Sequence, residues 1–412
     1  MSDIKKETPL LSDNSSNFRL TPQHLIIYLI MFTEIIGFAI VYPILPYIGF
    51  DLGLNELEIG FIGSIFSFCQ LFASPITGKL SDRFGRRPLL IFSQISTLMG
   101  FVLLGFAGKI WILVTARIID GLFGSNMTVC QAALSDITAH ENRTTVYSYS
   151  SGIFGAGLIV GPLIGGLLST INYSVPMFVA AGISFLSIIL VIFFIPETNN
   201  SQTTTLSIKF NEILPIKETK KYIKDNRTRK TLFLFFLYSF SFMLFINNFT
   251  LYVENKYHIG PDIASYYRTW IGILRVILQL FLMKSLLKKM GETWGFLTGA
   301  ISLLICMVGL IFSWNYFIAF IPMIFLAYGT GMARPILTSR LTKSVKQSES
   351  ATILGISNAL NSLGQILTPI IGGAVLLYLN PNFLPLLSAI GFIFTIYMST
   401  ARNGEKNEIK LL

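Results

Sequence analysis

The stretch GKLSDRFGRRPL, residues 78–89, is a short charged turn between two long apolar runs, 58–79 and 88–107. Each run has about the 20 residues that an α-helix needs to cross a hydrocarbon layer roughly 30 Å thick. The turn therefore predicts two membrane-crossing helices that are tightly joined at one membrane surface.

Similar apolar runs fill most of the chain, which has 412 residues, 52% of them hydrophobic and 13% charged. A water-soluble domain of this size would not have this balance. The sequence therefore indicates an all-α membrane protein with twelve transmembrane helices. The predicted spans are 24–49, 58–79, 88–107, 111–135, 147–169, 174–195, 231–253, 261–283, 293–312, 315–338, 351–378 and 382–401.

The distribution of Lys and Arg predicts the orientation of the spans. With both termini inside, 25 of the 31 basic residues lie in the tails and loops of the cytoplasmic side. Two others, Lys109 and Lys256, face outside, and four arginines lie within spans. Because cytoplasmic loops carry the excess of basic residues, both termini are expected in the cytoplasm. This distribution also accounts for the net charge of +10 without a nucleic-acid partner.

One long polar stretch, residues 197–230, divides the spans six and six. It predicts a cytoplasmic linker between an N-terminal bundle, 24–196, and a C-terminal bundle, 231–401. Cytoplasmic tails are expected at 1–23 and 402–412. The basic end of the linker has an alternative interpretation as a site for lipid head groups.

An internal repeat relates the two halves. A shift of 207 residues lays GPLIGG at 161–166 on TPIIGG at 368–373, and Gly157 on Gly364. The fifth span therefore corresponds to the eleventh. We expect two pseudo-symmetric six-helix bundles, with a small-molecule substrate bound between them near the middle of the membrane.

The turn at 78–89 contains more than a basic loop requires, because Asp82 stands between two spaced glycines. A carboxylate among guanidinium groups can bond one set of partners when a transporter faces outward and lose them when it opens inward. The pattern resembles the loop signature of the major facilitator superfamily, which implies a cytoplasmic gate and the major facilitator fold. The gating residues would be Gly78, Asp82, Arg83, Gly85, Arg86 and Arg87.

Closely spaced glycines in the fifth span leave one helix face without side chains, so that another helix can pack very closely. The pattern resembles the antiporter motif of the twelve-span drug:proton antiporter branch of that superfamily, and this resemblance implies export. Ordinary small-residue packing is the alternative. The motif residues are Gly157, Gly161, Pro162, Gly165 and Gly166.

Glu34 lies within the first span, roughly 15 Å from its start at His24 at 1.5 Å per residue. An ionised carboxylate at that depth costs about 2.5–3.5 kcal/mol unless it is paired. We therefore expect Glu34 to take up and release a proton rather than stay charged. The segment 34–46 is similar to the first span of tetracycline-type and multidrug exporters, which implies the same role. A structural, hydrogen-bonding glutamate is the alternative.

The fourth span contains Arg117 followed by Gly121, a spacing that matches the superfamily, and Asp120, which departs from it. The resemblance implies that Arg117 assists proton transfer, with Glu34 as its partner on another helix. Asp120 can instead neutralise Arg117 on the same helix face. A static ion pair that orders the bundle is the alternative to a role in proton transfer.

The second half has different polar groups within its spans. Arg275 could bind an anionic group, whereas Arg334 resembles a structural arginine of the exporter branch. The loop that matches the gate has Lys288 where Asp82 would fall, so a weaker gate is expected there. The candidate substrate-binding residues are Asn247, Asn248, Arg275, Arg334, Asn358, Asn361 and Gln365.

These features predict a proton-coupled antiporter that exports small amphiphilic or drug-like molecules by alternating access. A proton symporter or facilitator for a sugar or an anionic metabolite is the alternative, and a transport-inactive receptor or lipid-handling relative is a third possibility. The sequence has no phosphate-binding glycine loop, metal-ligand cluster or soluble catalytic domain, so we expect no enzyme, no metal and no cofactor other than the proton gradient. We expect a monomer in the cell membrane.

Overall fold

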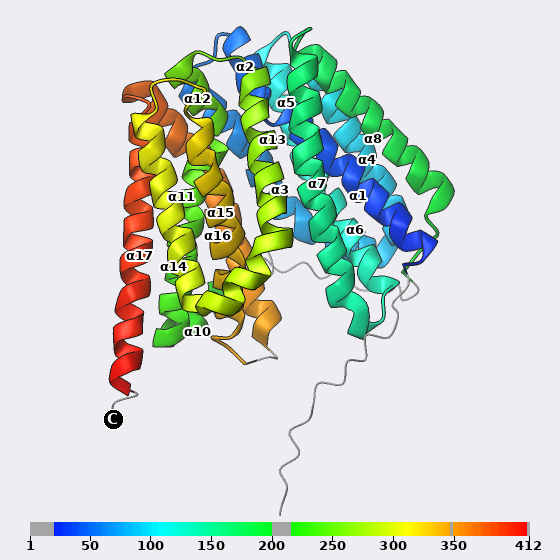
Figure 1. The fold of residues 1–412 in the computed structure, drawn as a ribbon. Helices are drawn as coiled ribbons and strands as arrows, with labels where there is room; N and C mark the ends of the chain where they lie inside the picture. The colour runs from blue at the N-terminus through cyan, green and yellow to red at the C-terminus, as the bar shows by residue number, and fades with distance from the viewer. Residues whose placement is uncertain (1–19, 200–215, 347–348, 410–412) are drawn as a thin grey trace, which may run out of the picture.

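The computed structural model describes residues 20–199, 216–346 and 349–409, which are helical and contain no β-strand in these ranges (Figure 1). The N-terminal half contains α1 (Pro22–Val41), α2 (Leu45–Asp51), α3 (Glu56–Phe84), α4 (Arg86–Gly105), α5 (Ile110–Phe123), α6 (Asn126–Asp136), η1 (His140–Asn142), α7 (Arg143–Ser169) and α8 (Ser174–Phe194). The C-terminal half contains α10 (Ile216–Lys224), α11 (Asn226–Asn247), α12 (Phe249–Tyr257), α13 (Pro261–Ile277), η2 (Leu278–Leu282), α14 (Met283–Phe312), α15 (Phe320–Thr342), α16 (Ser350–Tyr378) and α17 (Phe383–Ile409).

Eleven membrane-crossing segments in the described ranges are long and apolar enough to span a bilayer. The remaining predicted span is α13, which has 17 residues and continues directly into the π-helical turn η2. Together α13 and η2 cover the predicted eighth span. The prediction of an all-helical membrane protein with twelve spans is therefore confirmed.

Three of the spans are interrupted, and each interruption has a local cause. The first span breaks between α1 and α2 beside Pro43, because proline cannot donate the hydrogen bond of a helix interior. The fourth span breaks at Gly124, where the backbone leaves the helical region between α5 and α6. The seventh breaks at Asn248, between α11 and α12. Breaks of this kind expose backbone and polar side chains within a membrane protein only where other helices cover them.

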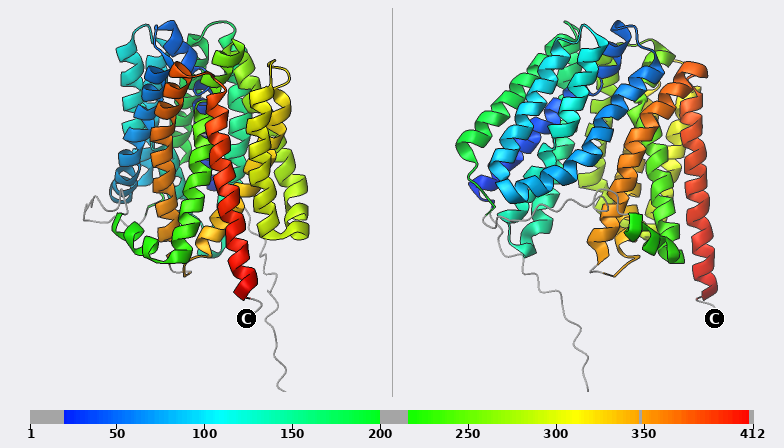
Figure 2. Two further views of the ribbon diagram at one scale, coloured as in Figure 1. Left: turned by 90° about the vertical axis from the view of Figure 1, so that its left-hand side faces the viewer. Right: turned by 180° about the vertical axis from the view of Figure 1, so that it is seen from behind.

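The two halves lie against each other at the end that carries α2 and α12, and their ribbons diverge toward the end that carries α10 and the start of α1 (Figure 1, Figure 2). The contacts between the halves run through α3 with α16 and α7 with α13. At the closed end, Tyr47 donates a hydrogen bond to the Ile259 carbonyl at 2.8 Å, and Asn255 donates to Glu56 at 2.7 Å.

The described part of the predicted linker contains the short helix α10, and α11 already begins within the predicted linker range, at Asn226. Lys221 of α10 bonds Glu349 at 2.6 Å, just before the start of α16. The hydrogen bond from this ammonium holds the pKa of the Glu349 carboxyl below its ordinary value. Most of the predicted N-terminal tail lies outside the described residues, and the predicted domain boundaries stay a prediction.

The glycine face of α7 packs directly on α1. A β-carbon at Gly157 would lie 2.6 Å from Cγ2 of Ile35, and one at Gly161 would overlap Ala39. At Gly165 a β-carbon would lie 2.7 Å from the Ile40 carbonyl oxygen. The backbones of the two helices can therefore approach only because these positions have no side chain.

The internal repeat recurs in this packing. On α7, Gly165 lies against α1 of its own half and Gly166 lies against α13 of the other half. On α16, Gly372 lies against Asn248 of its own half, and Gly373 lies against α3 of the other half. Each glycine-rich helix thus joins the first helix of its own bundle to a helix of the opposite bundle.

We predict that Gly161→Ala destabilises the protein while Gly152→Ala does not. A methyl group at Gly161 would also lie 3.0 Å from the Ile36 carbonyl oxygen, whereas no atom lies within 4 Å of the position at Gly152. Overpacking of this kind costs about 1–3 kcal/mol, while alanine is a better helix former than glycine. Thermal unfolding of the two variants in the same detergent measures the difference. Equal midpoints would show that α7 and α1 do not depend on this contact.

Candidate functional site

The gate residues form a cluster where α3 meets α4. Gly85 joins the two helices with a φ of +98°, a conformation that favours glycine. The next residue, Arg86, is only 7% exposed. Its guanidinium group lies 2.6 Å from Asp82 and 2.8 Å from Asp136, and it donates to the Ser81 hydroxyl at 2.6 Å. Arg86 therefore ties α3, α4 and α6 together within the N-terminal half.

Glu197, which the sequence placed only in the linker, completes this cluster. Its carboxylate accepts hydrogen bonds from the backbone N–H groups of Arg86 at 2.7 Å and Arg87 at 3.2 Å. A carboxylate is favourable there because the first N–H groups of a helix lack partners and carry a partial positive charge. A β-carbon at Gly85 would overlap this carboxylate. The end of the sixth span thus caps the start of the third.

The other gate residues contribute less to the cluster. Arg87 donates to the Ile192 carbonyl at 2.6 Å, and the guanidinium of Arg83 lies over the ring of Phe84, 5.2 Å from its centroid. A β-carbon at Gly78 would make ordinary contact with Thr128 of α6 at 3.8 Å. The ion pairs of Asp82 and Arg86 both lie within the N-terminal half, so in this conformation the cluster braces one bundle.

The C-terminal half has a matching junction with the charges reversed. Gly291 has a φ of +71° at the position that corresponds to Gly85. The next residue, Glu292, pairs with Lys343 at 2.6 Å. Laying Gly291 on Gly85 places Glu292 on Arg86, and the shift of 207 residues places Lys343 on Asp136. Lys288, which stands at the position of Asp82, is not part of this pair. Both side chains are about half exposed, which agrees with the expectation of a weaker contact.

We predict that Arg86→Gln lowers the stability of the protein by about 2–3 kcal/mol. This is less than the 3–5 kcal/mol expected for breaking a fully buried pair, because Asp82 is 48% exposed. The matched control is Glu292→Gln, which breaks the equivalent exposed pair and should cost under about 1 kcal/mol. Thermal or denaturant unfolding in detergent distinguishes the two. A larger loss in the Glu292 variant would contradict the assignment of Arg86 as the main brace.

Glu34 lies on α1, half-buried, among neutral polar groups of the N-terminal half. Gln94 of α4 donates a hydrogen bond to its carboxylate at 3.2 Å, and Asn126 of α6 is the second amide that acts on it. The Gln94 amide oxygen in turn accepts from Ser184 of α8 at 3.3 Å. Among the described residues Glu34 has no ion pair.

A chain of hydrogen bonds continues from Asn126, at the start of α6, to Asp120 of α5. The Asn126 amide donates to the Thr97 hydroxyl at 3.0 Å, and Thr97 donates to Asp120 at 3.0 Å. The other oxygen of Asp120 lies 3.6 Å from Arg117. The break at Gly124 allows this arrangement, since it separates α5, which carries Asp120, from α6, which begins with Asn126.

The expected pairing of Arg117 with Glu34 is absent from this conformation. Arg117 pairs with Asp120, three residues later on the same helix face, and its guanidinium lies over Phe66, 5.6 Å from the ring centroid. The nearer carboxylate competes successfully because it requires no movement between helices. Glu34 and Arg117 are therefore linked through Asn126, Thr97 and Asp120 rather than directly.

Thr97 and Asn126 were not predicted from the sequence, and no residue of the third span was expected in this site. Thr97 follows Gln94 by three residues, so the two side chains lie on one face of a helix. This polar pair within an apolar span was the available signal. Which neighbouring helix it faces depends on the packing of α4, which a single sequence does not specify.

The two asparagines of the seventh span hold helices together. Asn247 donates to the Thr368 hydroxyl at 2.9 Å, and Asn248 donates to the Thr368 carbonyl at 2.8 Å. The Asn247 amide oxygen also accepts from Tyr42 of the N-terminal half at 3.2 Å. Both residues therefore lie at the contact between α11 and α16, and Arg268 of α13 donates a hydrogen bond to the neighbouring Ile246 carbonyl at 3.4 Å.

The remaining candidates lie on α13, α15 and α16. Arg334 is exposed on α15 and Arg275 is partly exposed on α13, and each acts electrostatically on the other. On α16, Asn358 and Gln365 are exposed and Asn361 is partly exposed. These amides form one stripe of α16, as their spacing of three and four predicts.

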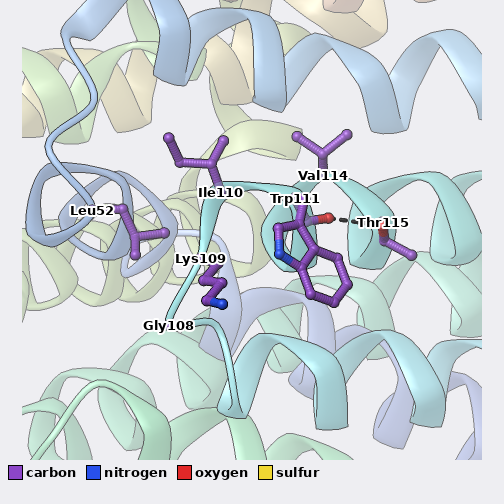
Figure 3. A pocket seen from close by; sticks show the side chains of 7 residues that line it. All are labelled: Leu52, Gly108, Lys109, Ile110, Trp111, Val114 and Thr115. Atoms are coloured by element: carbon purple, nitrogen blue, oxygen red, sulfur yellow. Dashed lines mark hydrogen bonds between the residues drawn. The ribbon is translucent and has the colours of Figure 1, made fainter.

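A surface groove at the start of α5 includes neither the gate residues nor the polar residues around Glu34. Figure 3 shows its lining, in which the Trp111 ring and the Lys109 side chain lie beside apolar residues. Trp111 is 63% exposed. A tryptophan and a lysine at the end of a span are typical of the boundary between lipid and water. The groove contains none of the predicted site residues.

The whole chain is similar to known membrane proteins. A family profile described as Major Facilitator Superfamily matches residues 27–369 and 231–408. The chain belongs to this superfamily. The superfamily consists of membrane transporters, so the prediction of a multi-pass transporter is confirmed, as is the predicted resemblance to its drug-exporter branch.

Relatives of this chain include proteins named for antibiotic and multidrug resistance. Tetracycline resistance protein, class H, of Pasteurella multocida is 29% identical over 84% of this chain and 87% of its own length. Tetracycline resistance protein, class B, of Escherichia coli is 25% identical over 91% of this chain and 96% of its own length. Multidrug resistance protein 2 of Bacillus subtilis is 25% identical over 93% and 95%.

Solved structures share the fold at lower identity. The nucleoside transporter NupG has a TM-score of 0.76 at 11% identity and covers 92% of this chain and 99% of its own. The human organic anion transporter MFSD10 has a TM-score of 0.68 at 15% identity over 92% of this chain and 100% of its own. The predicted major facilitator fold is therefore confirmed.

Proposed function

We propose that the protein exports small amphiphilic or drug-like molecules in exchange for protons. The observation that carries this proposal is the environment of Glu34, a carboxyl that two amides contact and that has no ion pair among the described residues. An ionised carboxylate in a membrane span is costly without a cation. Binding a proton removes that cost, so Glu34 can exchange protons as its access to water changes.

The position of Glu34 couples proton exchange to the relative movement of the two halves. Glu34 lies on α1 next to Ile35, which is the residue against which Gly157 of α7 packs. The same helix α7 contacts α13 of the other half, where a β-carbon at Gly272 would lie 2.6 Å from Ile159. A change in α1 is thus transmitted through closely packed backbones to the contact between the bundles.

The conformation also supports alternating access. The halves are in contact at the end with α2 and α12 and diverge at the end with the gate cluster (Figure 2). With both termini in the cytoplasm, as the distribution of basic residues predicts, this conformation opens inward. We propose that the protein works as a monomer in the cell membrane, without a cofactor other than the proton gradient. The names of the resistance relatives support export as the direction.

We predict that Glu34→Gln abolishes proton-driven transport while leaving the protein folded. An amide can replace the hydrogen-bonding role of Glu34 but cannot carry a proton. Tetracycline, a quinolone and a lipophilic cation are suitable first probes. The measurements are proton release from the purified protein on addition of each probe, and uptake into proteoliposomes with an imposed pH gradient.

The matched control is Glu58→Gln, which removes a carboxyl at the start of α3 where the residue bonds the backbone of Asn55. It should transport like the unmodified protein. If Glu34→Gln still exchanges protons for substrate, Glu34 is structural and the proposed mechanism is wrong.

A symporter for an anionic metabolite is the second candidate, and the pair Arg275 and Arg334 is the observation that favours it. The direction of proton movement separates the two. An antiporter releases protons when the substrate binds, whereas a symporter takes them up. Proton uptake with an anionic probe would support the second candidate.

A further inference from the structure

The strongest unexplained feature is a pair of arginines without counter-ions in the C-terminal half. Arg275 of α13 and Arg334 of α15 interact electrostatically with each other and with Tyr238 of α11. In the described part of the chain, neither guanidinium group has a hydrogen bond or an ion pair with protein. The two charges therefore repel each other, and no described carboxylate pairs with either of them.

The sequence of this half offers no carboxylate partner at the same depth. Residues 231–401 contain four acids, Glu254, Asp262, Glu292 and Glu349, and all four lie at or near helix ends or junctions. Asp262 shares α13 with Arg275 but stands 13 residues earlier, roughly 20 Å along the helix axis at 1.5 Å per residue. The two arginines consequently depend on water or on a bound ligand for compensation.

Two other arginines within the spans contact protein groups. Arg117 pairs with Asp120 at 3.6 Å. Arg268, seven residues before Arg275 on α13, donates to Thr250 at 3.2 Å and lies 4.8 Å from the ring centroid of Tyr42. Among the described residues, Arg117 and Arg268 thus have protein partners for part of their guanidinium groups, whereas Arg275 and Arg334 have none.

Tyr238 supplies the second, independent observation. Its side chain is 1% exposed, yet its hydroxyl has no hydrogen-bond partner among the described residues. A buried hydroxyl without a partner costs about 1–3 kcal/mol in general. Its ring is held edge-on against Phe392 with centroids 6.2 Å apart, and its hydroxyl is an unused donor on which both arginines act electrostatically.

The helix backbone is irregular next to both arginines. Arg275 is followed three residues later by the π-helical turn η2, a rare conformation that is frequent at functional sites. Arg334 is followed by Pro335, which removes one backbone hydrogen bond from α15. Arg334 is exposed on α15, which packs against α11, α13, α14 and α16.

We propose that Arg275, Arg334 and Tyr238 bind the oxyanion group of an amphiphilic substrate, such as the carboxylate of an aromatic acid. Guanidinium groups match a carboxylate with two parallel hydrogen bonds, and the tyrosine hydroxyl adds a third donor. The surrounding spans are apolar and receive the body of the ligand. This proposal rests on the proposed function, because it names the class of molecule that the exporter carries.

The test uses three probes that share a naphthalene ring and differ in the head group, namely 2-naphthoate, the neutral 2-naphthamide and 2-naphthylmethylammonium. Binding to the purified full-length protein in detergent is measured by calorimetry at one pH. The unmodified protein should bind naphthoate at least tenfold more tightly than the amide or the ammonium. Arg275→Gln and Arg334→Gln should each remove this difference, Arg275→Lys should keep part of it, and Tyr238→Phe should reduce it.

The matched control is Arg340→Gln, which removes a charge from the same helix as Arg334, where Arg340 donates to the Glu292 carbonyl. It should bind naphthoate as the unmodified protein does. Equal binding of the carboxylate and the amide, or an equal loss in the Arg340 variant, overturns the proposal. Monodisperse elution of each variant, together with unchanged binding of the amide, separates loss of the site from misfolding.

Two further measurements identify the source of the oxyanion and separate its binding from proton exchange. A phosphate on a lipid head group has the same chemistry, so short-chain phosphatidylglycerol is tested alone; arginine-dependent binding of this lipid without binding of naphthoate overturns the assignment to a substrate. Glu34→Gln should still bind naphthoate in a way that depends on the two arginines, while losing transport driven by a pH gradient. Binding without such transport in the unmodified protein would refute proton exchange and leave the oxyanion site in place.

Discussion

The close approach of α7 to α1 is the constraint on which the rest of this structure depends. Glycines at 157, 161 and 165 let the two backbones touch, and this contact fixes α1, which carries Glu34, relative to α13 of the other half. Such a contact cannot deform gradually, because packed backbones have little free volume. Movement at the contact between α7 and α1 must therefore occur as a shift of whole helices, which is what exchange between two conformations requires.

The two halves use the same architecture with different electrostatics. In the N-terminal half, Arg86 and Arg117 both have carboxylate partners, and Glu34 has no ion pair among the described residues. In the C-terminal half, Arg268 has polar and aromatic partners, and Arg275 and Arg334 have no ion pair among the described residues. The repeat explains the shared backbone, including the glycines at the two gate junctions, but charge has diverged at equivalent positions. The N-terminal half is thus suited to exchanging a proton at Glu34, and the C-terminal half to holding a negatively charged group at its two arginines.

Much of the fold was predictable because it depends on length and periodicity. Runs of apolar residues predict the spans, and the spacing of the glycines predicts the close contact of α7 with another helix. The site was less predictable, because it depends on how helices rotate about their axes. Gln94 meets Glu34, and Glu197 caps α4, through contacts between residues 60 and 111 positions apart. The break at Gly124 and the π-turn after Arg275 are further features that propensity does not specify, since packing decides them.

The separation of the two unpaired groups has an energetic consequence. In the proposed exchange, a proton that enters through the N-terminal half would carry one positive charge inward, and an organic anion that leaves from the C-terminal half would carry one negative charge outward. An exchange of one for one then moves two charges across the membrane in the favourable direction. At about 2.3 kcal/mol per charge per 100 mV, the membrane potential adds roughly 4.6 kcal/mol per 100 mV to the pH gradient. A cationic substrate would lose this contribution, because its outward charge cancels that of the proton. The uncompensated arginines therefore favour a class of substrate for which a single proton drives strong accumulation outside.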